Sequence, residues 1–222
     1  CKHLKQKFYG KTDISEFSQP RTMVLWSSFM TCENKEAEIV SQGTKVNWEH
    51  KVPLNETFFS KFNSPCVIDL PGFNYDLEQH AKERELMKAF FSDGADKDAI
   101  RKKYNELAFA HHREIKNRFA AALSEGHDLV VGYFSVIDVV GHLNFGNKAL
   151  MRILYREMDE LAGALAERDD ISHLIVLSDH GMYAVGPYGD HSNYGFWSTN
   201  FADLGVPKIT SFGEVINSVS AS

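Results

Sequence analysis

The chain has 222 residues, of which 43% are hydrophobic and 12% aromatic, so it can bury one substantial core. Its formal net charge of -6 argues against attraction to nucleic acid or to an anionic membrane, because both bind cationic surfaces. No apolar run approaches the roughly 20 residues that span a bilayer, and the basic start CKHLKQKFYGK lacks the apolar stretch of a signal peptide.

The first predicted element is a helix that begins at Thr22 and continues through the apolar run 23–30. The stretch 32–64 is polar and poorly periodic, and we expect a small cap or an excursion from the main fold there. Residues 66–68 then form a short apolar run that predicts a weak strand.

Two amphipathic helices follow. Asp76 is a candidate cap for a helix that begins at Leu77. Apolar side chains then recur every three or four residues from 100 to 123, which predicts one long helix. The same spacing over 150–165 predicts another.

The runs 129–137 (LVVGYFSVI) and 174–177 (LIVL) are rich in β-branched residues and predict buried parallel strands. The helix 150–165 lies between them, and strand, helix, strand is the repeating unit of a parallel sheet. We therefore expect a single α/β domain over 1–222, with a central, mostly parallel sheet flanked by helices.

Three cysteines, Cys1, Cys32 and Cys66, have no CxxC spacing. They predict neither a disulfide framework nor a thiolate zinc site. A reducing, cytoplasmic setting is the corresponding expectation.

Each of the two strong strands leads into a carboxylate and an imidazole. The first runs into Asp138 and His142 in DVVGH, and the second into Asp179 and His180 in SDHGM. Open α/β sheets place their ligand sites at the carboxyl ends of strands, so we expect these side chains to converge. One such pair could merely cap a helix, but two pairs favour a shared site.

A further imidazole, His191, follows in the glycine-bounded segment GDHSNYG. Carboxylate oxygen with imidazole nitrogen suits zinc, manganese or iron, whereas magnesium favours oxygen alone. Two carboxylates and three histidines fall one ligand short of two ordinary metal sites with three protein ligands each.

Thr22 is the candidate nucleophile. At the start of a helix, the backbone N–H groups and the helix dipole favour both an alkoxide and a bound phosphate. A hydroxyl becomes a good nucleophile when coordination to a metal lowers its pKa. A threonine in this position can also serve only as a helix cap, and the residues alone leave both readings open.

Four segments, PRTMVLWSSFMTC, IDVVGH, LSDHGM and GDHS followed by GF, resemble the type I phosphodiesterase/nucleotide pyrophosphatase branch of the alkaline phosphatase superfamily. They cover most of the chain in the family's order. The resemblance implies an alkaline-phosphatase-like α/β sandwich that hydrolyses a small-molecule phosphodiester or phosphomonoester. It also implies two divalent metal ions, for which zinc is the first choice and manganese the alternative.

By the same resemblance, one metal is held by Asp138, His142 and His191 and the other by Asp179 and His180. Thr22 would bridge the two metals, which lie about 4 Å apart in such sites, and would accept the phosphoryl group. Water would then hydrolyse the phosphothreonine.

The chain departs from the family pattern in two ways. Family members carry a further aspartate ligand in an Asp-Gly pair, at the end of a strand before the nucleophile. Asp13, in the unpatterned KTDISEF, does not fit it, so we expect that strand to lie before Cys1. Cys32 stands where the family usually has glycine, and the Pro…His-Gly pattern beyond it is missing, which leaves the substrate open.

Three alternatives accompany this reading. Intramolecular phosphoryl transfer and sulfate ester hydrolysis occur in the same superfamily, but those enzymes use serine or a modified residue, so Thr22 argues against both. A metal-binding relic without turnover is the third. The aromatic residues Phe58, Phe59, Phe62, Phe196 and Trp197 could line a pocket, although we expect core packing.

Overall fold

The computed structural model describes residues 1–43 and 48–220. The strands are β1 (Phe8–Asp13), β2 (Pro65–Ile68), β3 (Leu129–Gly132), β4 (Ile175–Ser178), β5 (Met182–Val185), β6 (Tyr188–His191) and β7 (Tyr194–Thr199). The helices are α1 (Thr22–Thr31), α2 (Glu36–Ser41), α4 (Leu77–Phe90), α5 (Lys97–Ala122), α6 (Val136–Asn144), α7 (Lys148–Ala166) and α8 (Phe212–Ser220). Short 3-10 turns are η1 (Leu54–Glu56), η2 (Phe58–Lys61) and η3 (Ile209–Ser211).

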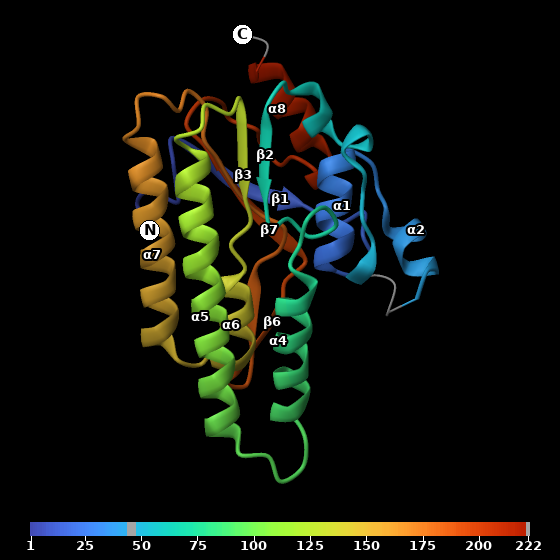
Figure 1. Ribbon diagram of the computed structural model, residues 1–222, viewed down its shortest axis with the longest axis vertical. Helices are drawn as coiled ribbons and strands as arrows, with labels where there is room; N and C mark the ends of the chain where they lie inside the picture. Colours follow the sequence, from blue (N-terminus) through green and yellow to red (C-terminus); the bar gives the residue numbers. More distant parts are fainter. Residues whose placement is uncertain (44–47, 221–222) are drawn as a thin grey trace.

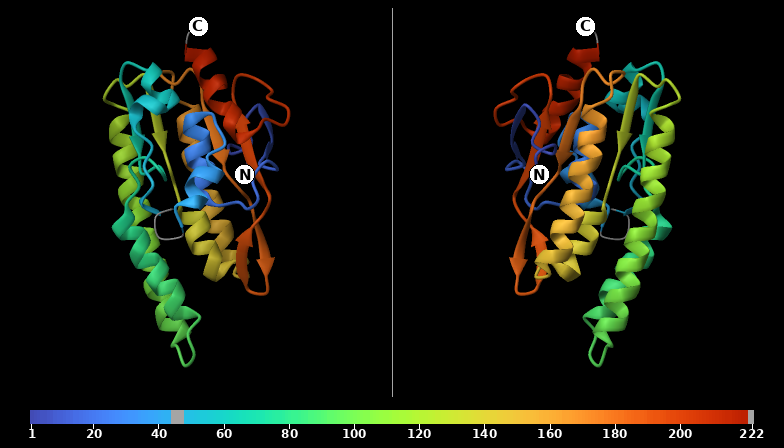
Figure 2. Two further views of the ribbon diagram at one scale, coloured as in Figure 1. Left: turned by 90° about the vertical axis from the view of Figure 1, so that its right-hand side faces the viewer. Right: turned by 90° about the vertical axis from the view of Figure 1, so that its left-hand side faces the viewer.

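The strands lie between two layers of helices. Helices α5 and α7 cover one side, and α1 and α8 cover the other (Figure 1). Figure 2 shows α1 in front of the strands from one side and α7 in front of them from the opposite side. The expected α/β class, with helices on both faces, is therefore confirmed.

The sheet is not the mostly parallel one that we expected. Strands β1, β7 and β4 form an antiparallel sheet in that order, and among the strands of the described residues only β2 and β3 pair in parallel. The chain reverses after β4 in the hairpin of β5 and β6, and β7 then returns alongside β4. The β5–β6 hairpin occupies this connection in place of the helical crossover that a parallel pair would need, so β7 runs antiparallel to β4.

The strand predicted at 129–137 is also shorter than expected. It ends at Gly132, and α6 begins at Val136. Val136, Val139 and Val140 are buried at helical spacing against the neighbouring helices. Packing of this apolar face against other helices outweighs the intrinsic strand preference of valine and isoleucine. That preference is the reason why the sequence predicted a strand here.

The predicted helices are present with closely similar bounds. Helix α1 begins at Thr22, and α5 and α7 cover the predicted spans. Asp76 caps α4, where its side chain accepts a hydrogen bond of 2.9 Å from the backbone N–H of Gln79. Strands β1 and β7 were not predicted.

The core surrounds α1 and the antiparallel sheet. Phe58, Phe59 and Trp197 are buried there, as expected for core residues. The described part of the stretch 32–64 packs on α1 through residues such as Ile39, whereas positions 44–47 lie outside the described residues. No helix in the described ranges is long and apolar enough to cross a membrane.

Candidate metal centre and active site

Helix α6 places Asp138 and His142 on one face. The two residues are four positions apart, so their side chains lie one above the other at one helical turn's distance. Oδ1 of Asp138 lies 3.5 Å from Nε2 of His142. The sequence predicted that these two residues meet but placed them at a strand end rather than in a helix.

The other candidate ligands come from the segment around the β5–β6 hairpin. Asp179 and His180 follow β4 directly, and His191 is the last residue of β6. Met182 of β5 packs against Gly141 of α6, where a Cβ would lie 2.5 Å from the methionine sulfur. The glycine therefore lets the hairpin approach α6 closely.

The side chains of α6 and of the hairpin segment meet in one cluster. Nε2 of His191 lies 3.3 Å from Oδ1 of Asp138 and 3.1 Å from Nε2 of His142. Ligand atoms of Asp138, His180 and His191 also lie within 4.8 Å of one another. The rings of His180 and His191 stack with centroids 3.7 Å apart, and Oδ2 of Asp179 lies 3.5 Å from Nε2 of His180.

All three imidazoles are oriented by backbone carbonyls. Nδ1 of His142 lies 3.2 Å from the carbonyl oxygen of Gly189, and Nδ1 of His180 lies 3.1 Å from that of Gly181. Nδ1 of His191 lies 3.1 Å from the carbonyl oxygen of Pro20. Because a carbonyl oxygen can only accept, each Nδ1 carries the donated proton, and Nε2 becomes available to a metal ion once it is deprotonated.

The cluster contains buried carboxylate oxygens that lack hydrogen-bond donors. Oδ1 of Asp138 and Oδ2 of Asp179 are inaccessible to solvent, and no hydrogen bond to them is formed within the described residues. A buried carboxylate without a donor is costly unless a cation compensates it. The side chains of Asp138 and His191 are still 26% and 20% exposed, so an ion can reach them.

The Asp138 carboxylate and the neighbouring imidazoles stabilise each other's charged forms. Burial alone would raise the pKa of Asp138, but the imidazoles of His142 and His191 hold that pKa well below its usual range. Burial opposes protonation of His191 as well, yet the Asp138 carboxylate outweighs it and raises the pKa of His191 to about 9. Burial raises the pKa of Asp179, with only partial compensation from His180.

The residues present fit a divalent metal ion. Ligands 2.0–2.1 Å from a tetrahedral metal lie about 3.3 Å apart, and the three atoms of Asp138, His142 and His191 are separated by 3.1–3.5 Å. Two nitrogens and a carboxylate oxygen form a donor set suited to zinc or manganese. Asp179 and His180 provide further donors beside this set.

Thr22 is connected to the cluster through Pro20, two residues earlier in the chain. It is the half-buried first residue of α1, and Arg21 provides no side-chain cap to the helix. The carbonyl of Pro20, two residues earlier, receives the hydrogen bond from His191. The start of α1 is thereby tied to the metal cluster.

Asp13 and Cys32, which depart from the family pattern, make other contacts. Oδ1 of Asp13 accepts a hydrogen bond of 2.8 Å from the backbone of Ser15, and β1 carries this residue at its end. Cys32 ends α1 with a positive φ of 60°. The carbonyls that orient the histidines were missed by sequence reasoning, because a backbone oxygen leaves no signature in residue type.

The family model for type I phosphodiesterase/nucleotide pyrophosphatase matches residues 3–202, which is most of the chain. The match supports a phosphoric ester hydrolase of the alkaline phosphatase superfamily. No curated protein and no solved structure matches the chain.

Proposed function

Because this chain belongs to the type I phosphodiesterase/nucleotide pyrophosphatase family, we propose that it hydrolyses a small phosphodiester or phosphomonoester with bound divalent metal ions and Thr22 as nucleophile. The finding that supports this most is the convergence of the Nε2 atoms of His142 and His191 on the Asp138 carboxylate. Nε2 of His180 lies beside the Asp179 carboxylate, and all three Nδ1 atoms are engaged by backbone carbonyls. That arrangement suits metal ligation and serves no evident packing role.

We assign the metal ligands in two sets. Asp138, His142 and His191 would hold one ion, and Asp179 and His180 would contribute to a second beside it. The ions, zinc or manganese, would supply Lewis acidity and positive charge where negative charge develops on the phosphoryl oxygens. The backbone carbonyls of Pro20, Gly181 and Gly189 would keep the imidazoles in the ligating tautomer.

Thr22 would act from the start of α1. Its Oγ1 forms a bond to phosphorus while the bond from phosphorus to the leaving oxygen breaks, and the released alkoxide becomes an alcohol by gaining a proton in exchange for the one that Thr22 loses. Water then breaks the bond between phosphorus and the threonine oxygen, which restores the hydroxyl. The uncapped first turn of α1 offers N–H groups to the phosphoryl oxygens.

Two alternatives predict other outcomes. A mutase or a sulfatase-like enzyme would act on phospho-sugars or sulfate esters in preference to diesters. A relic would bind metal without turnover. Assay of the metal-loaded protein on bis(4-nitrophenyl) phosphate, 4-nitrophenyl phosphate and 4-nitrophenyl sulfate tests the proposal. Release of nitrophenol from the phosphate esters supports it, and release from the sulfate ester alone, or from none, contradicts it.

A further inference from the structure

The β5–β6 hairpin, which carries His191, is a sheet of its own. In the described part of the chain β5 pairs only with β6. Figure 2 shows this hairpin, drawn in orange, beside the yellow helix α6 and below the other strands. An isolated two-stranded hairpin is at best marginally stable in water, so its position depends on contacts with other elements. The position of His191, its last residue, depends on the same contacts.

Met182 is the residue of β5 that packs against α6. It is half-buried and lies opposite His191 in the hairpin, whereas the next three residues of β5 are exposed. A Cβ at Gly141 would lie 2.5 Å from its sulfur, and a Cβ at Gly189 would overlap the same atom. The thioether is thus inserted between a glycine of α6 and a glycine of β6.

Other contacts hold the far end of the hairpin. The backbone N–H of Gly146 donates a hydrogen bond of 2.8 Å to the carbonyl oxygen of Pro187, in the turn. The ring of Tyr188 packs edge-on against Phe90, with centroids 5.7 Å apart. These contacts fix the tip, whereas Met182 lies at the base, next to the proposed ligands. Loss of the Met182 side chain should therefore loosen the base while the tip stays attached.

The two glycines bring together the backbones that carry the proposed ligands. Gly141 directly precedes His142, and the carbonyl oxygen of Gly189 lies 3.2 Å from Nδ1 of His142. A Cβ at Gly189 would also lie 2.9 Å from the carbonyl oxygen of Gly141. A change in the separation of α6 and β6 therefore moves both the carbonyl that orients His142 and the imidazole of His191.

We propose that Met182 is a positioning residue of the metal centre, whose side chain sets the separation of α6 and β6 and so the approach of His191 to His142. This role rests on the proposed metal centre, and Met182 acts through the histidines without being a ligand. An unbranched thioether suits the irregular space between two glycines. A shorter side chain would leave a void into which the hairpin can shift, and the donor atoms would then fit one ion less well.

The test is calorimetric titration of the metal-free protein with zinc, which needs no turnover. We expect Met182→Ala to weaken zinc binding about 10- to 100-fold, the range typical of groups that orient metal ligands. Met182→Leu keeps nearly the same volume and should restore the affinity to within about 3-fold of the parent. The matched control Met158→Ala removes the same side chain from a half-buried position on α7 and should also stay within about 3-fold.

A second set of variants tests the glycine side of the contact. Alanine has a higher helix propensity than glycine, so a loss of zinc affinity in Gly141→Ala has no backbone origin. We expect that loss to be about 10-fold, because the new Cβ collides with the methionine sulfur. Gly141→Ala combined with Met182→Ala should bind zinc more tightly than Gly141→Ala alone, since the shorter side chain frees the space that the Cβ needs. Additive losses in the double variant would contradict the insertion of Met182 between the glycines.

Hydrogen exchange in the metal-free protein separates this inference from the proposed function. Amides of residues 182–191 should exchange about 10-fold faster in Met182→Ala, and at the parent rate in Met182→Leu and Met158→Ala. That result supports the positioning of the hairpin even in a protein that hydrolyses nothing. Unchanged zinc affinity in Met182→Ala overturns the proposal where the parent binds zinc, and unchanged exchange overturns it where the parent binds none. An equal loss in Met158→Ala overturns it in either case.

Discussion

The Nε2 atoms of His142 and His191 lie 3.1 Å apart, while each ring donates its Nδ1–H to a backbone carbonyl. Two nitrogen lone pairs at this distance repel each other unless a proton or a metal ion lies between them. Asp138 lies 3.3 Å and 3.5 Å from the same two nitrogens and adds negative charge. The pair is therefore suited to hold a cation, and we expect a divalent metal to satisfy all three atoms together.

Removal of a ligand should abolish hydrolysis and leave the fold intact. We expect His142→Ala and Asp179→Asn each to lower kcat/KM for bis(4-nitrophenyl) phosphate by about 10³-fold or more, because the charge that stabilises the transition state is lost. Far-ultraviolet circular dichroism should match the parent protein. His173→Ala is the control, since that ring is exposed and packs on Phe201. Full activity in both ligand variants would rule out the assigned set.

The proposed role of Thr22 as nucleophile can be tested with substitutions that retain or remove its hydroxyl. Thr22→Ala should lose about 10³-fold or more in kcat, whereas Thr22→Ser keeps a hydroxyl at the same helix terminus and should retain a measurable fraction. Acid quenching during turnover, followed by peptide mass spectrometry, should find phosphate on the peptide that contains residue 22. Undiminished turnover in Thr22→Ala would show that another group attacks phosphorus.

Removal of the bound metal by a chelator should abolish activity and lower the stability of the fold. A metal that binds only the folded chain raises its stability by mass action, about 2.7 kcal/mol at a free concentration 100 times Kd. We therefore expect EDTA to abolish hydrolysis and to lower the Tm, and added zinc or manganese to restore both. The apparent metal affinity should fall as pH falls, because the imidazoles must lose their protons to bind. An unchanged Tm and rate after dialysis against EDTA would contradict the metal assignment.

The sequence located the residues of the cluster but not the elements that hold them. Asp138 and His142 were expected after a strand, because VVGYFSVI has a strand-forming composition. They lie instead on α6, whose apolar residues are buried at helical spacing. Asp138 and His142 lie close together all the same, since residues four apart on a helix meet as readily as residues at the ends of neighbouring strands.

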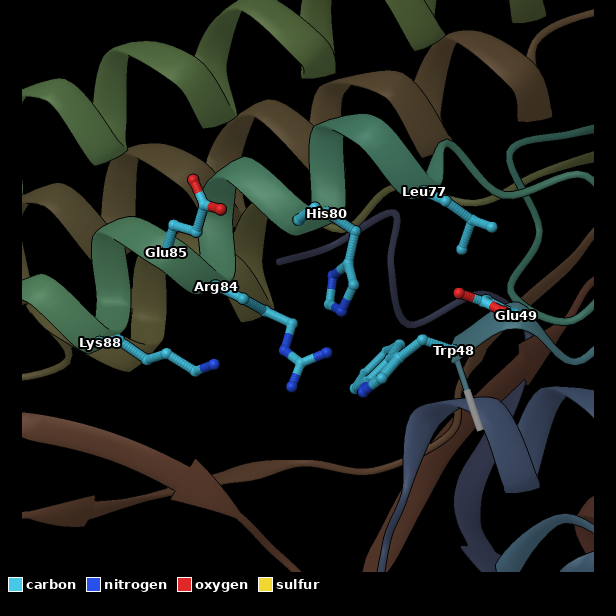
Figure 3. A pocket seen from close by; sticks show the side chains of 8 residues that line it. Trp48, Glu49, Leu77, His80, Arg84, Glu85 and Lys88 are labelled. Atoms are coloured by element: carbon cyan, nitrogen blue, oxygen red, sulfur yellow. The ribbon is translucent and has the colours of Figure 1, made fainter. Parts of the chain in front are cut away.

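A cavity lined by Trp48, Glu49 and side chains of α4 could not be predicted from sequence patterns (Figure 3). His80, Arg84 and Lys88 have the spacing of one helix face, but that spacing is equally typical of a solvated surface. Only the tertiary fold brings Trp48 onto this face, from a segment without readable periodicity. The antiparallel sheet was missed similarly, because β1 and β7 are polar or mixed strands that pair across the whole length of the chain.

Glu83 should make stability depend on pH. It is only 3% exposed, and burial raises its pKa from 4.5 to about 7. Between these two pH values the unfolded chain releases the proton while the folded chain keeps it, so the contribution present below pH 4.5 is lost as pH rises through about 7. Relative to Glu83→Gln, the free energy of unfolding of the parent should fall by about 3 kcal/mol over this window.

Urea unfolding at several pH values measures this difference. Glu85→Gln is the matched control, because Glu85 is an exposed carboxylate on the same helix and its replacement should leave the pH dependence of the parent unchanged. Parallel pH profiles for the parent and Glu83→Gln would show that Glu83 titrates as it does in the unfolded chain.

The most direct test of the metal centre is X-ray diffraction from crystals grown with zinc, recorded on both sides of the zinc absorption edge. We predict an anomalous peak within about 2.0–2.2 Å of Oδ1 of Asp138 and of Nε2 of His142 and His191. Anomalous density confined to other surface residues, or a cluster that stays free of zinc at saturating concentration, would contradict the account.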